Sequence, residues 1–186
     1  MKKVFLKFIL FFLFTSFNAN ALENKMIIEI KHGKIHIELY PEVAPNHVKR
    51  FETLVKNKEY DGVVFHRVID GFMAQTGDVM FGNSNKDTFD LSRVGTGGSN
   101  LPDLKAEFSN LPHVRGTLSM ARSSNPNSAN SQFFICFDSA PHLDRNYTVF
   151  GKVTKGMELV DKIKKGTDSS GTVDNPDKIL NITLAK

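Results

Sequence analysis

Two short segments of the 186-residue chain hold the side chains whose types and spacing could do chemistry. Residues 65–78 set the guanidinium of Arg67 close to the apolar pair Phe72 and Met73 and to the neutral amide of Gln75. A guanidinium only donates hydrogen bonds, an amide donates and accepts, and aromatic and thioether groups supply apolar surface. Taken one at a time, such residues are more often structural, as surface ion pairs or as core. Residues 116–135 form the second segment.

Other reactive residue types do not form a site. The histidines show no metal-ligand spacing, and Gly95–Gly98 lacks the lysine and the strand-to-helix context of a phosphate-binding loop. His66, beside Arg67, should point to the opposite side of a strand and is interpreted as structural. The single cysteine, Cys136, lies in an apolar run, so we interpret it as a small buried hydrophobe rather than a reactive thiol.

The pattern around these segments predicts mainly β structure. From Ile28 to Leu39, apolar and polar residues alternate around a turn at His32-Gly33, which indicates a hairpin with one buried face. Apolar residues at spacings of three and four predict helices at 46–56 and 157–164. Six further short strands are predicted at 63–67, 72–75, 116–121, 132–136, 149–153 and 179–184. Many short strands with two helices indicate a mainly β domain that closes on itself.

The two segments resemble the signature segments of the cyclophilins, a family of peptidyl-prolyl cis-trans isomerases. The resemblance rests on the run Phe65-His66-Arg67 to Asp78, on Gly116 to Arg122, and on Ser131-Gln132-Phe133-Phe134-Ile135. It covers nearly all of the chain after the first two dozen residues. The resemblance implies a closed eight-stranded antiparallel β-barrel capped by two α-helices, without a cofactor or a metal.

The implied reaction is rotation about an Xaa-Pro peptide bond, whose uncatalysed barrier is roughly 18–20 kcal/mol. No bond is made or broken, so neither a nucleophile nor a proton relay is needed. The barrier comes from delocalisation of the nitrogen lone pair into the carbonyl. A guanidinium aimed at the prolyl nitrogen stabilises the twisted state, where that nitrogen is basic, more than the planar ground state. One such bond is worth about 1.5–3 kcal/mol, so a twisted binding geometry and an apolar site must supply the rest.

The resemblance also assigns roles to individual residues. Phe72, Met73, Phe134 and Leu143 match the proline pocket, and Gln75 and Gln132 match glutamines that hold the arginine and meet the substrate carbonyl. The backbone of Ala121 and Arg122 matches the segment that binds the residue before proline. The predicted catalytic residues are Arg67, Phe72 and Gln75; the predicted substrate-binding residues are Met73, Ala121, Arg122, Gln132, Phe134, His142, Leu143 and Tyr147.

Three positions depart from the pattern common in eukaryotic members. Arg122 replaces an asparagine, His142 replaces a tryptophan that helps to bind cyclosporin, and Tyr147 stands where those members have histidine. We therefore expect weak inhibition by cyclosporin with isomerase activity kept. The Gly95–Gly98 run matches the family's glycine-rich loop beside the pocket.

The first residues predict export. Lys2, Lys3 and Lys7 flank or interrupt an apolar run of about 14 residues, too short for the roughly 20 that span a bilayer. Ala19-Asn20-Ala21 then has the small-x-small pattern of a signal-peptidase site. We predict a cleaved signal peptide at 1–21, an isomerase domain at 22–186 and a periplasmic location; an uncleaved membrane anchor is the alternative. Without those three lysines, 21 basic residues face 20 acidic ones, a charge of +1 that indicates no nucleic-acid binding.

The sequence thus predicts a monomeric periplasmic isomerase that acts on proline-containing unfolded or partly folded polypeptides, with no stable membrane association after the signal is removed. Two alternatives share the fold: a proline-binding module without turnover, and a holdase chaperone. The polar segment 79–94 is interpreted as an insertion relative to compact family members, either a solvated loop or a lid or partner site.

Overall fold

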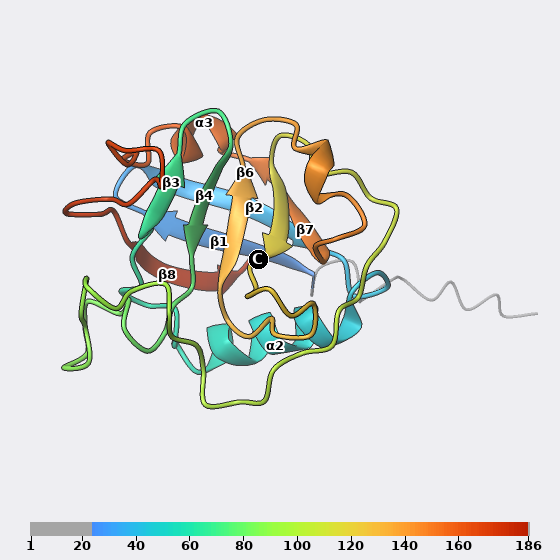
Figure 1. Cartoon of the computed structure of the whole chain (residues 1–186), viewed down its shortest axis with the longest axis horizontal. Helices are drawn as coiled ribbons and strands as arrows, with labels where there is room; N and C mark the ends of the chain where they lie inside the picture. Colours follow the sequence, from blue (N-terminus) through green and yellow to red (C-terminus); the bar gives the residue numbers. More distant parts are fainter. Residues whose placement is uncertain (1–23, 186) are drawn as a thin grey trace, which may run out of the picture.

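A computed structural model describes residues 24–185 of the chain, so the predicted signal peptide lies outside the described residues. One curled antiparallel sheet of eight strands, in the order β3-β4-β6-β5-β7-β2-β1-β8, forms its framework (Figure 1). The strands are β1 (Lys25–Ile30), β2 (Gly33–Leu39), β3 (Arg67–Ile69), β4 (Met73–Thr76), β5 (Thr117–Met120), β6 (Phe133–Cys136), β7 (Val149–Lys155) and β8 (Ile179–Leu184). The mainly β prediction is confirmed.

The hairpin β1–β2 is confirmed, and its alternation explains its burial. Ile28 and Ile30 on β1, and Ile35 and Ile37 on β2, are at most 2% exposed, whereas the polar residues between them face outward. Alternate side chains of a strand point to opposite faces, so one face of the hairpin joins the core.

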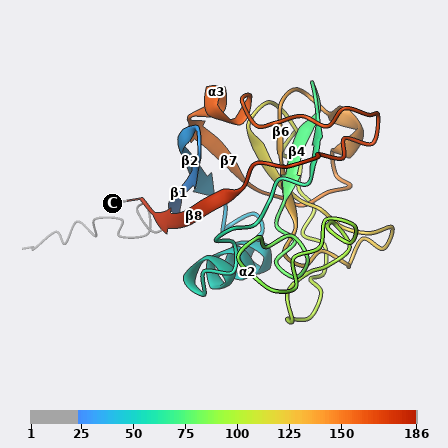
Figure 2. The same ribbon diagram turned by 90° about the vertical axis from the view of Figure 1, so that its left-hand side faces the viewer.

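Two helices lie at opposite ends of the curled sheet (Figure 2). Helix α2 (Pro45–Lys56) begins one residue before the prediction, since Pro45 suits the first turn, where its missing N–H costs nothing. Helix α3 (Met157–Val160) is shorter than the predicted 157–164. The helix ends at Val160, and four residues further on the backbone N–H of Lys164 donates to Asp177 Oδ2 at 3.0 Å rather than to a helical carbonyl.

The prediction of a closed barrel is wrong in detail, because no ladder joins the outer strands β3 and β8. The strand predicted at 63–67 starts only at Arg67, and the residues before it approach the 172–178 segment through single bridges such as Val64 with Lys178. Asn175 has a left-handed φ of 52° and Pro176 has no N–H to donate, so this segment cannot run as a regular strand. The result is a curled half-barrel.

Nearly every residue of β4, β5 and β6 is buried, so these strands pack on both faces. Val68, Ala74, Leu118, Phe133 and Ile135 point into the main core. Their neighbours in sequence point the other way and form a second apolar cluster with η1 (Pro141–Leu143), made of Met73, Phe134, Cys136, Ala140 and Leu143. Both sequence segments singled out for chemistry contribute to this second face.

Among residues 24–185, no helix is long and apolar enough to cross a bilayer.

Candidate functional site

Strand register brings the predicted residues into one row. Arg67 on β3 lies opposite Gln75 on β4, and Gln75 lies opposite Phe134 on β6. Phe134 in turn faces Ser119 on β5. Residues directly opposite across antiparallel strands have Cβ atoms about 4.5–5.5 Å apart, so the row spans four strands without a gap.

Arg67 is held from two sides. Its Nε donates to the carbonyl oxygen of Ser170 at 2.9 Å, and its Nη1 donates to Gln75 Oε1 at 3.4 Å. The sulfur of Met73 lies 4.0 Å from the same Nη1. The half-buried guanidinium therefore has a defined position before any ligand arrives.

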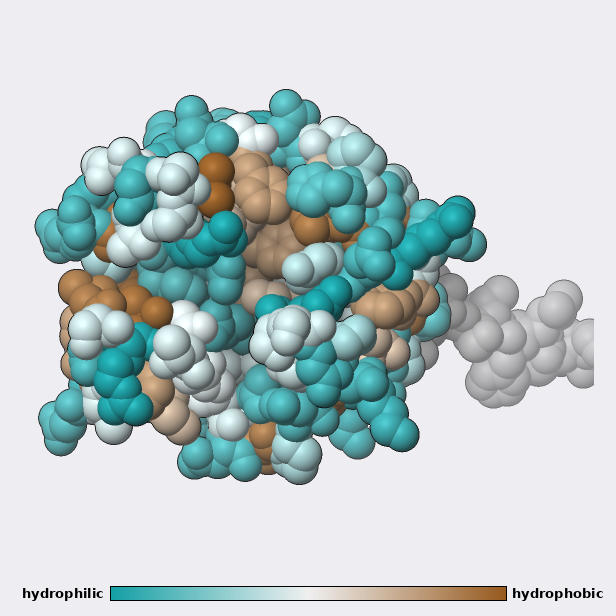
Figure 3. Space-filling model, in the orientation of Figure 1, coloured by the Kyte–Doolittle hydropathy of each residue, from teal (hydrophilic) through white to brown (hydrophobic). Residues whose placement is uncertain are grey.

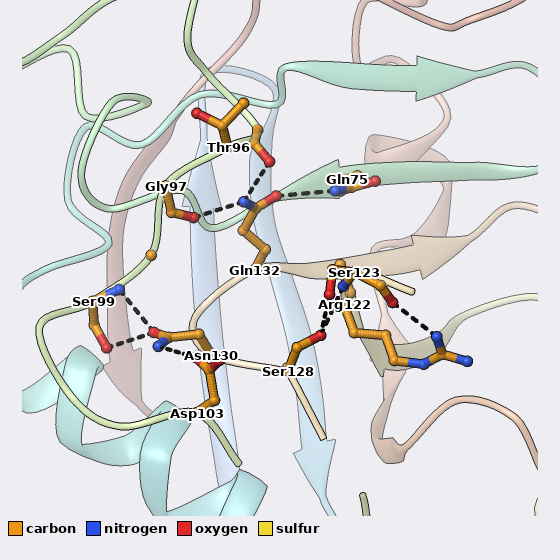
Figure 4. A pocket seen from close by; sticks show the side chains of 13 residues that line it. Gln75, Thr96, Gly97, Ser99, Asp103, Arg122, Ser123, Ser128, Asn130 and Gln132 are labelled. Atoms are coloured by element: carbon orange, nitrogen blue, oxygen red, sulfur yellow. Dashed lines mark hydrogen bonds between the residues drawn. The ribbon is translucent and has the colours of Figure 1, made fainter. Parts of the chain in front are cut away.

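Two glutamine side chains extend the hydrogen bonding of Arg67, each in a fixed orientation. Gln132 Nε2 donates to the carbonyl oxygens of Gly95 and Gly97 at 2.9 and 2.8 Å, so its Oε1 must face Gln75. Gln75 Nε2 donates to that oxygen at 3.0 Å, and Figure 4 shows the two side chains pointing toward one another. The carbonyl of Gln75 is then left to face Arg67, so the glycine-rich loop sets the amide that orients the guanidinium.

A pocket of about 340 Å³ opens beside Arg67; because apolar and aromatic side chains form its base and polar groups its rim, we call it the apolar pocket. It is lined by Arg67, Phe72, Met73, Gln75, Ala121, Arg122, Phe134, His142, Leu143 and Tyr147. Figure 3 shows hydrophobic surface at the bottom of a hollow over β6, ringed by hydrophilic residues. Such a site can hold an uncharged apolar ring and present a cationic donor at its rim.

Aromatic rings form the walls of this pocket. Tyr147 meets Phe134 edge-on, with ring centroids 6.0 Å apart and planes at 77°. On the opposite wall, His142 lies 5.5 Å from Phe72. Both arrangements are favourable for rings and make flat surfaces against which a ring can pack.

Arg122 braces the Tyr147 wall. Its Nη1 donates to Ser123 O at 2.8 Å, its Nη2 to Asn146 O at 3.0 Å, and its guanidinium lies 4.4 Å from the centre of the Tyr147 ring. Ala121, the residue before it, donates its N–H to Gln132 O at 2.9 Å. Its own carbonyl is then the backbone group available to a ligand.

A polar hollow of about 430 Å³ adjoins the pocket and shares Gln75, Ala121 and Arg122 with it. Gln132 lies here rather than in the apolar pocket, together with Asp103 and Asn130 (Figure 4). Ten of the predicted site residues thus line one pocket. The eleventh, Gln132, lines the adjoining polar hollow and is hydrogen-bonded to Gln75.

Sequence analysis missed several residues that hold this site. Ser170, which binds Arg67 through its carbonyl, is 103 positions away in the chain and carries no local signal. His113 lies against Phe134 and Tyr147 but was grouped with histidines that lack metal-ligand spacing.

Other predictions at single residues can be compared with the structure directly. His66 is buried, does not line the pocket, and has a pKa lowered to about 4 by burial. Cys136 is buried as interpreted, and burial raises the pKa of its thiol to about 12, which disfavours the reactive thiolate. Residues 79–94 contribute nothing to the apolar pocket, so they are no lid over it in this structure. Across residues 24–185, no cluster of three His, Cys, Asp or Glu could hold a metal.

Comparisons with known proteins identify the family of this chain. Residues 25–184 match the family model of cyclophilin type peptidyl-prolyl cis-trans isomerases. A probable peptidyl-prolyl cis-trans isomerase of Brucella suis is 61% identical over 163 residues, covering 87% of this chain and 83% of that protein. A peptidyl-prolyl cis-trans isomerase of Acinetobacter baylyi is 42% identical over 90% of this chain and 89% of its own length.

Solved structures show the same fold. The crystal structure of a Cryptosporidium parvum cyclophilin type isomerase, determined in the presence of the dipeptide Ala-Pro, has a TM-score of 0.72 at 28% identity and covers 87% of this chain and 99% of its own. Cyclophilin AquaCyp293 from Hirschia baltica has a TM-score of 0.71 at 26% identity, over 87% of this chain and 74% of its own. The chain belongs to the cyclophilin-type peptidyl-prolyl cis-trans isomerases, enzymes that rotate the peptide bond before proline.

Proposed function

We propose that the apolar pocket beside Arg67 binds the proline ring of exported polypeptides and that Arg67 donates to the prolyl nitrogen as the bond twists. The observation that carries the proposal is the guanidinium held at the rim of the pocket by Ser170 and Gln75. The Ala-Pro dipeptide present with the Cryptosporidium relative supports a proline-containing ligand.

The geometry assigns a division of labour within the guanidinium. Nε and one N–H of Nη1 already donate within the protein, so we propose that Nη2 donates to the prolyl nitrogen. Phe72, Met73, Phe134 and Leu143 hold the ring, while the carbonyl side of the bond stays free to rotate. Gln75, fixed through Gln132, keeps the donor aimed at the twisted state, which is the differential stabilisation that lowers the barrier.

The substrates we propose are proline-containing unfolded or partly folded polypeptides in the periplasm. This part rests on residues 1–21, whose lysines, apolar run and Ala-x-Ala site are typical of a signal peptide. The mature enzyme is proposed to be a monomer without stable membrane association. Expression of the full gene in a Gram-negative host, fractionation and N-terminal sequencing test it: mature protein starting at Leu22 in the periplasm is expected, and an intact N-terminus in the cytoplasm or the membrane contradicts it.

Exchange NMR on a short Ala-Pro peptide tests the pocket. We expect the protein to accelerate cis-trans exchange, with the peptide shifting signals of Ala121 and Leu143. Shifts at these residues without faster exchange would identify a proline-binding module. Neither effect, with suppressed aggregation of an unfolded protein, would identify a holdase.

A further inference from the structure

His113 lies directly behind the pocket wall without lining the pocket. It is 1% exposed, and its ring is stacked on Phe134 with centroids 6.2 Å apart and planes at 19°. The same ring meets Tyr147 edge-on at 6.5 Å. One buried residue therefore contacts both of the rings that form this wall.

The backbone and ring of His113 also clamp η1, which carries His142 and Leu143. At one end of η1, the N–H of Ala140 donates to His113 O at 2.8 Å. At the other end, Asp144 Oδ1 accepts from the His113 backbone N–H at 2.8 Å and contacts its ring Nδ1 at 3.0 Å. An ionised carboxylate only accepts hydrogen bonds, so Nδ1 carries the proton.

The other ring nitrogen connects His113 to the strand row. Its Nε2 lies 3.0 Å from Ser119 Oγ, and that hydroxyl lies 3.1 Å from Thr148 O. A serine hydroxyl has one proton to give. With neutral His113 it donates to Nε2; with protonated His113, Nε2 donates to Oγ and the hydroxyl turns to Thr148 O. Thr148 O also accepts from the N–H of Met120 at 3.0 Å, so both arrangements leave every group bonded.

We propose that His113 is a positioning residue for the isomerase reaction: through Ser119 and Asp144 it sets the orientation of Phe134, Tyr147 and Leu143 around the substrate proline. This inference rests on the proposed function of the pocket and names a residue that does not touch the substrate. A wall held by hydrogen bonds at both edges keeps the ring in the geometry that the twisted state needs, so its loss should lower turnover more than binding.

The charges around His113 favour the neutral form at neutral pH. Burial lowers its pKa, Asp144 opposes this, and His142 on η1 adds to the lowering. Hydrogen bonds from the backbone and ring of His113 lower the pKa of the Asp144 carboxyl, with a smaller effect from Arg145, and on β6 burial raises the pKa of the Cys136 thiol, which stays uncharged. Because the pKa of His113 is lowered, this residue becomes protonated only in acid, and its protonation would turn the Ser119 hydroxyl away from the ring.

His113→Phe tests the proposal, because phenylalanine keeps a ring against Phe134 but removes both ring hydrogen bonds. The matched control is His47→Phe: His47 is 0% exposed and bonds Glu107 through Nδ1 at 2.7 Å, but it lies on α2 and does not line the pocket. With kcat and KM measured by exchange NMR on the full chain, we expect kcat to fall roughly tenfold in His113→Phe with KM within about threefold, and no change in His47→Phe.

The pH profile gives a second readout. The kcat/KM of the wild-type protein should fall in acid as His113 becomes protonated, and this fall should be missing in His113→Phe and present in His47→Phe. Equal kcat in His113→Phe and wild type, equal losses in both variants, or identical pH profiles in all three would overturn the inference.

Wild-type protein keeps the inference testable if His113→Phe does not fold. In a pH titration, the ring NMR signals of Phe134 and Tyr147 should then shift with the same midpoint as the ring nitrogens of His113. Signals of Phe134 and Tyr147 that do not change as His113 titrates would overturn the inference. A wild-type protein that accelerates no exchange at all would instead contradict the proposed function.

Discussion

The guanidinium of Arg67 owes its aim to neighbours that are themselves fixed. Gly95 and Gly97 orient Gln132, Gln132 orients Gln75, and Gln75 orients Arg67. Each amide has one arrangement in which all its bonds are made, since donors and acceptors are not interchangeable. Catalysis by a single charged donor depends on this order, because only a donor that is already placed favours the twisted state without reorganisation.

Arg122 should govern substrate affinity more than turnover. In Arg122→Ala, the braces from Asn146 O and Ser123 O and the cover over Tyr147 disappear, so the wall loosens. We expect KM to rise several-fold, with kcat within about twofold. Steady-state and exchange NMR kinetics measure both, and an unchanged KM with a large loss in kcat would contradict this assignment.

His142 should limit inhibition by cyclosporin. It stands at the position where resemblance to eukaryotic cyclophilins implies a tryptophan that helps to bind the drug, and it offers a smaller ring beside Phe72. His142→Trp should tighten cyclosporin inhibition by about tenfold or more, since one buried aromatic anchor is worth about 2 kcal/mol. The measurement is an inhibition titration at fixed peptide concentration. Equal inhibition of the two proteins would show that this position does not control the drug.

Strand parity explains why the site lies where it does. Arg67, Gln75 and Phe134 share one face of β3, β4 and β6, while Val68, Ala74 and Ile135 fill the main core from the other face. Arg67 and Gln75 on the first face are only half-buried, so this face stays accessible to a ligand while the other face is core. The site uses the outer face of the same strands that build the core.

The glycine-rich loop can be tested at Gly97. A methyl group there would lie 2.5 Å from Asp78 Oδ1, and Asp78 cannot retreat because it accepts four backbone N–H bonds, from Met80, Phe81, Gly95 and Gly97. Gly97→Ala should lower the free energy of unfolding by about 1–3 kcal/mol and displace the carbonyls that hold Gln132. The free energy of unfolding, measured in urea, and kcat/KM should both be lower in the variant. A stable and fully active variant would contradict the chain of hydrogen bonds from the glycine-rich loop to Arg67.

Much of this element-level picture could be predicted from the sequence. The strands predicted at 72–75, 116–121, 132–136, 149–153 and 179–184 lie within two residues of β4 to β8, because short runs of strand-forming residues between turns mark them locally. The failures involve partners distant in the chain. The helix predicted at 157–164 ends at Val160, and the backbone N–H of Lys164 donates to Asp177 instead. Residues 63–66 meet the irregular segment around Pro176. Neither contact leaves a trace in local periodicity.

The same limit applies to the site. Motif resemblance located all the residues that line the pocket, but not Ser170 and His113, which hold its components in place. Pocket residues are found by their types and spacing. Residues that hold the site in place can be recognised only in the folded structure, where segments distant in the sequence lie side by side.

At the scale of the whole molecule, buried histidines should make stability depend on pH. Burial lowers the pKa of His66 to about 4, and it also lowers those of His47 and His113. The unfolded chain, with an ordinary value near 6.5, then binds more protons than the native one as the pH falls from about 6.5 to 4. The free energy of unfolding therefore has its full value above about pH 6.5 and decreases as the pH falls to about 4.

His66 alone should contribute about 3 kcal/mol to this loss. Urea unfolding at pH 7.5 and 4.5 checks the value in the wild-type protein and in His66→Leu, which lacks the titrating ring. The variant should lose less free energy between the two pH values than the wild type. Parallel losses in the two proteins would mean that His66 does not cause the effect.

The most direct test of the whole account is the effect of Arg67→Ala on turnover and on binding, measured separately. Exchange NMR on an Ala-Pro peptide gives kcat, and shift titration of the pocket gives Kd; Arg115→Ala, which removes an ion pair with Asp161 outside the pocket, is the control. We expect Arg67→Ala to lower kcat roughly ten- to a hundred-fold, the worth of one charged hydrogen bond, with Kd within about threefold and the control unchanged. If Arg67→Ala keeps the wild-type kcat, or if its affinity for the peptide and its kcat fall by the same factor, the guanidinium does not stabilise the twisted state.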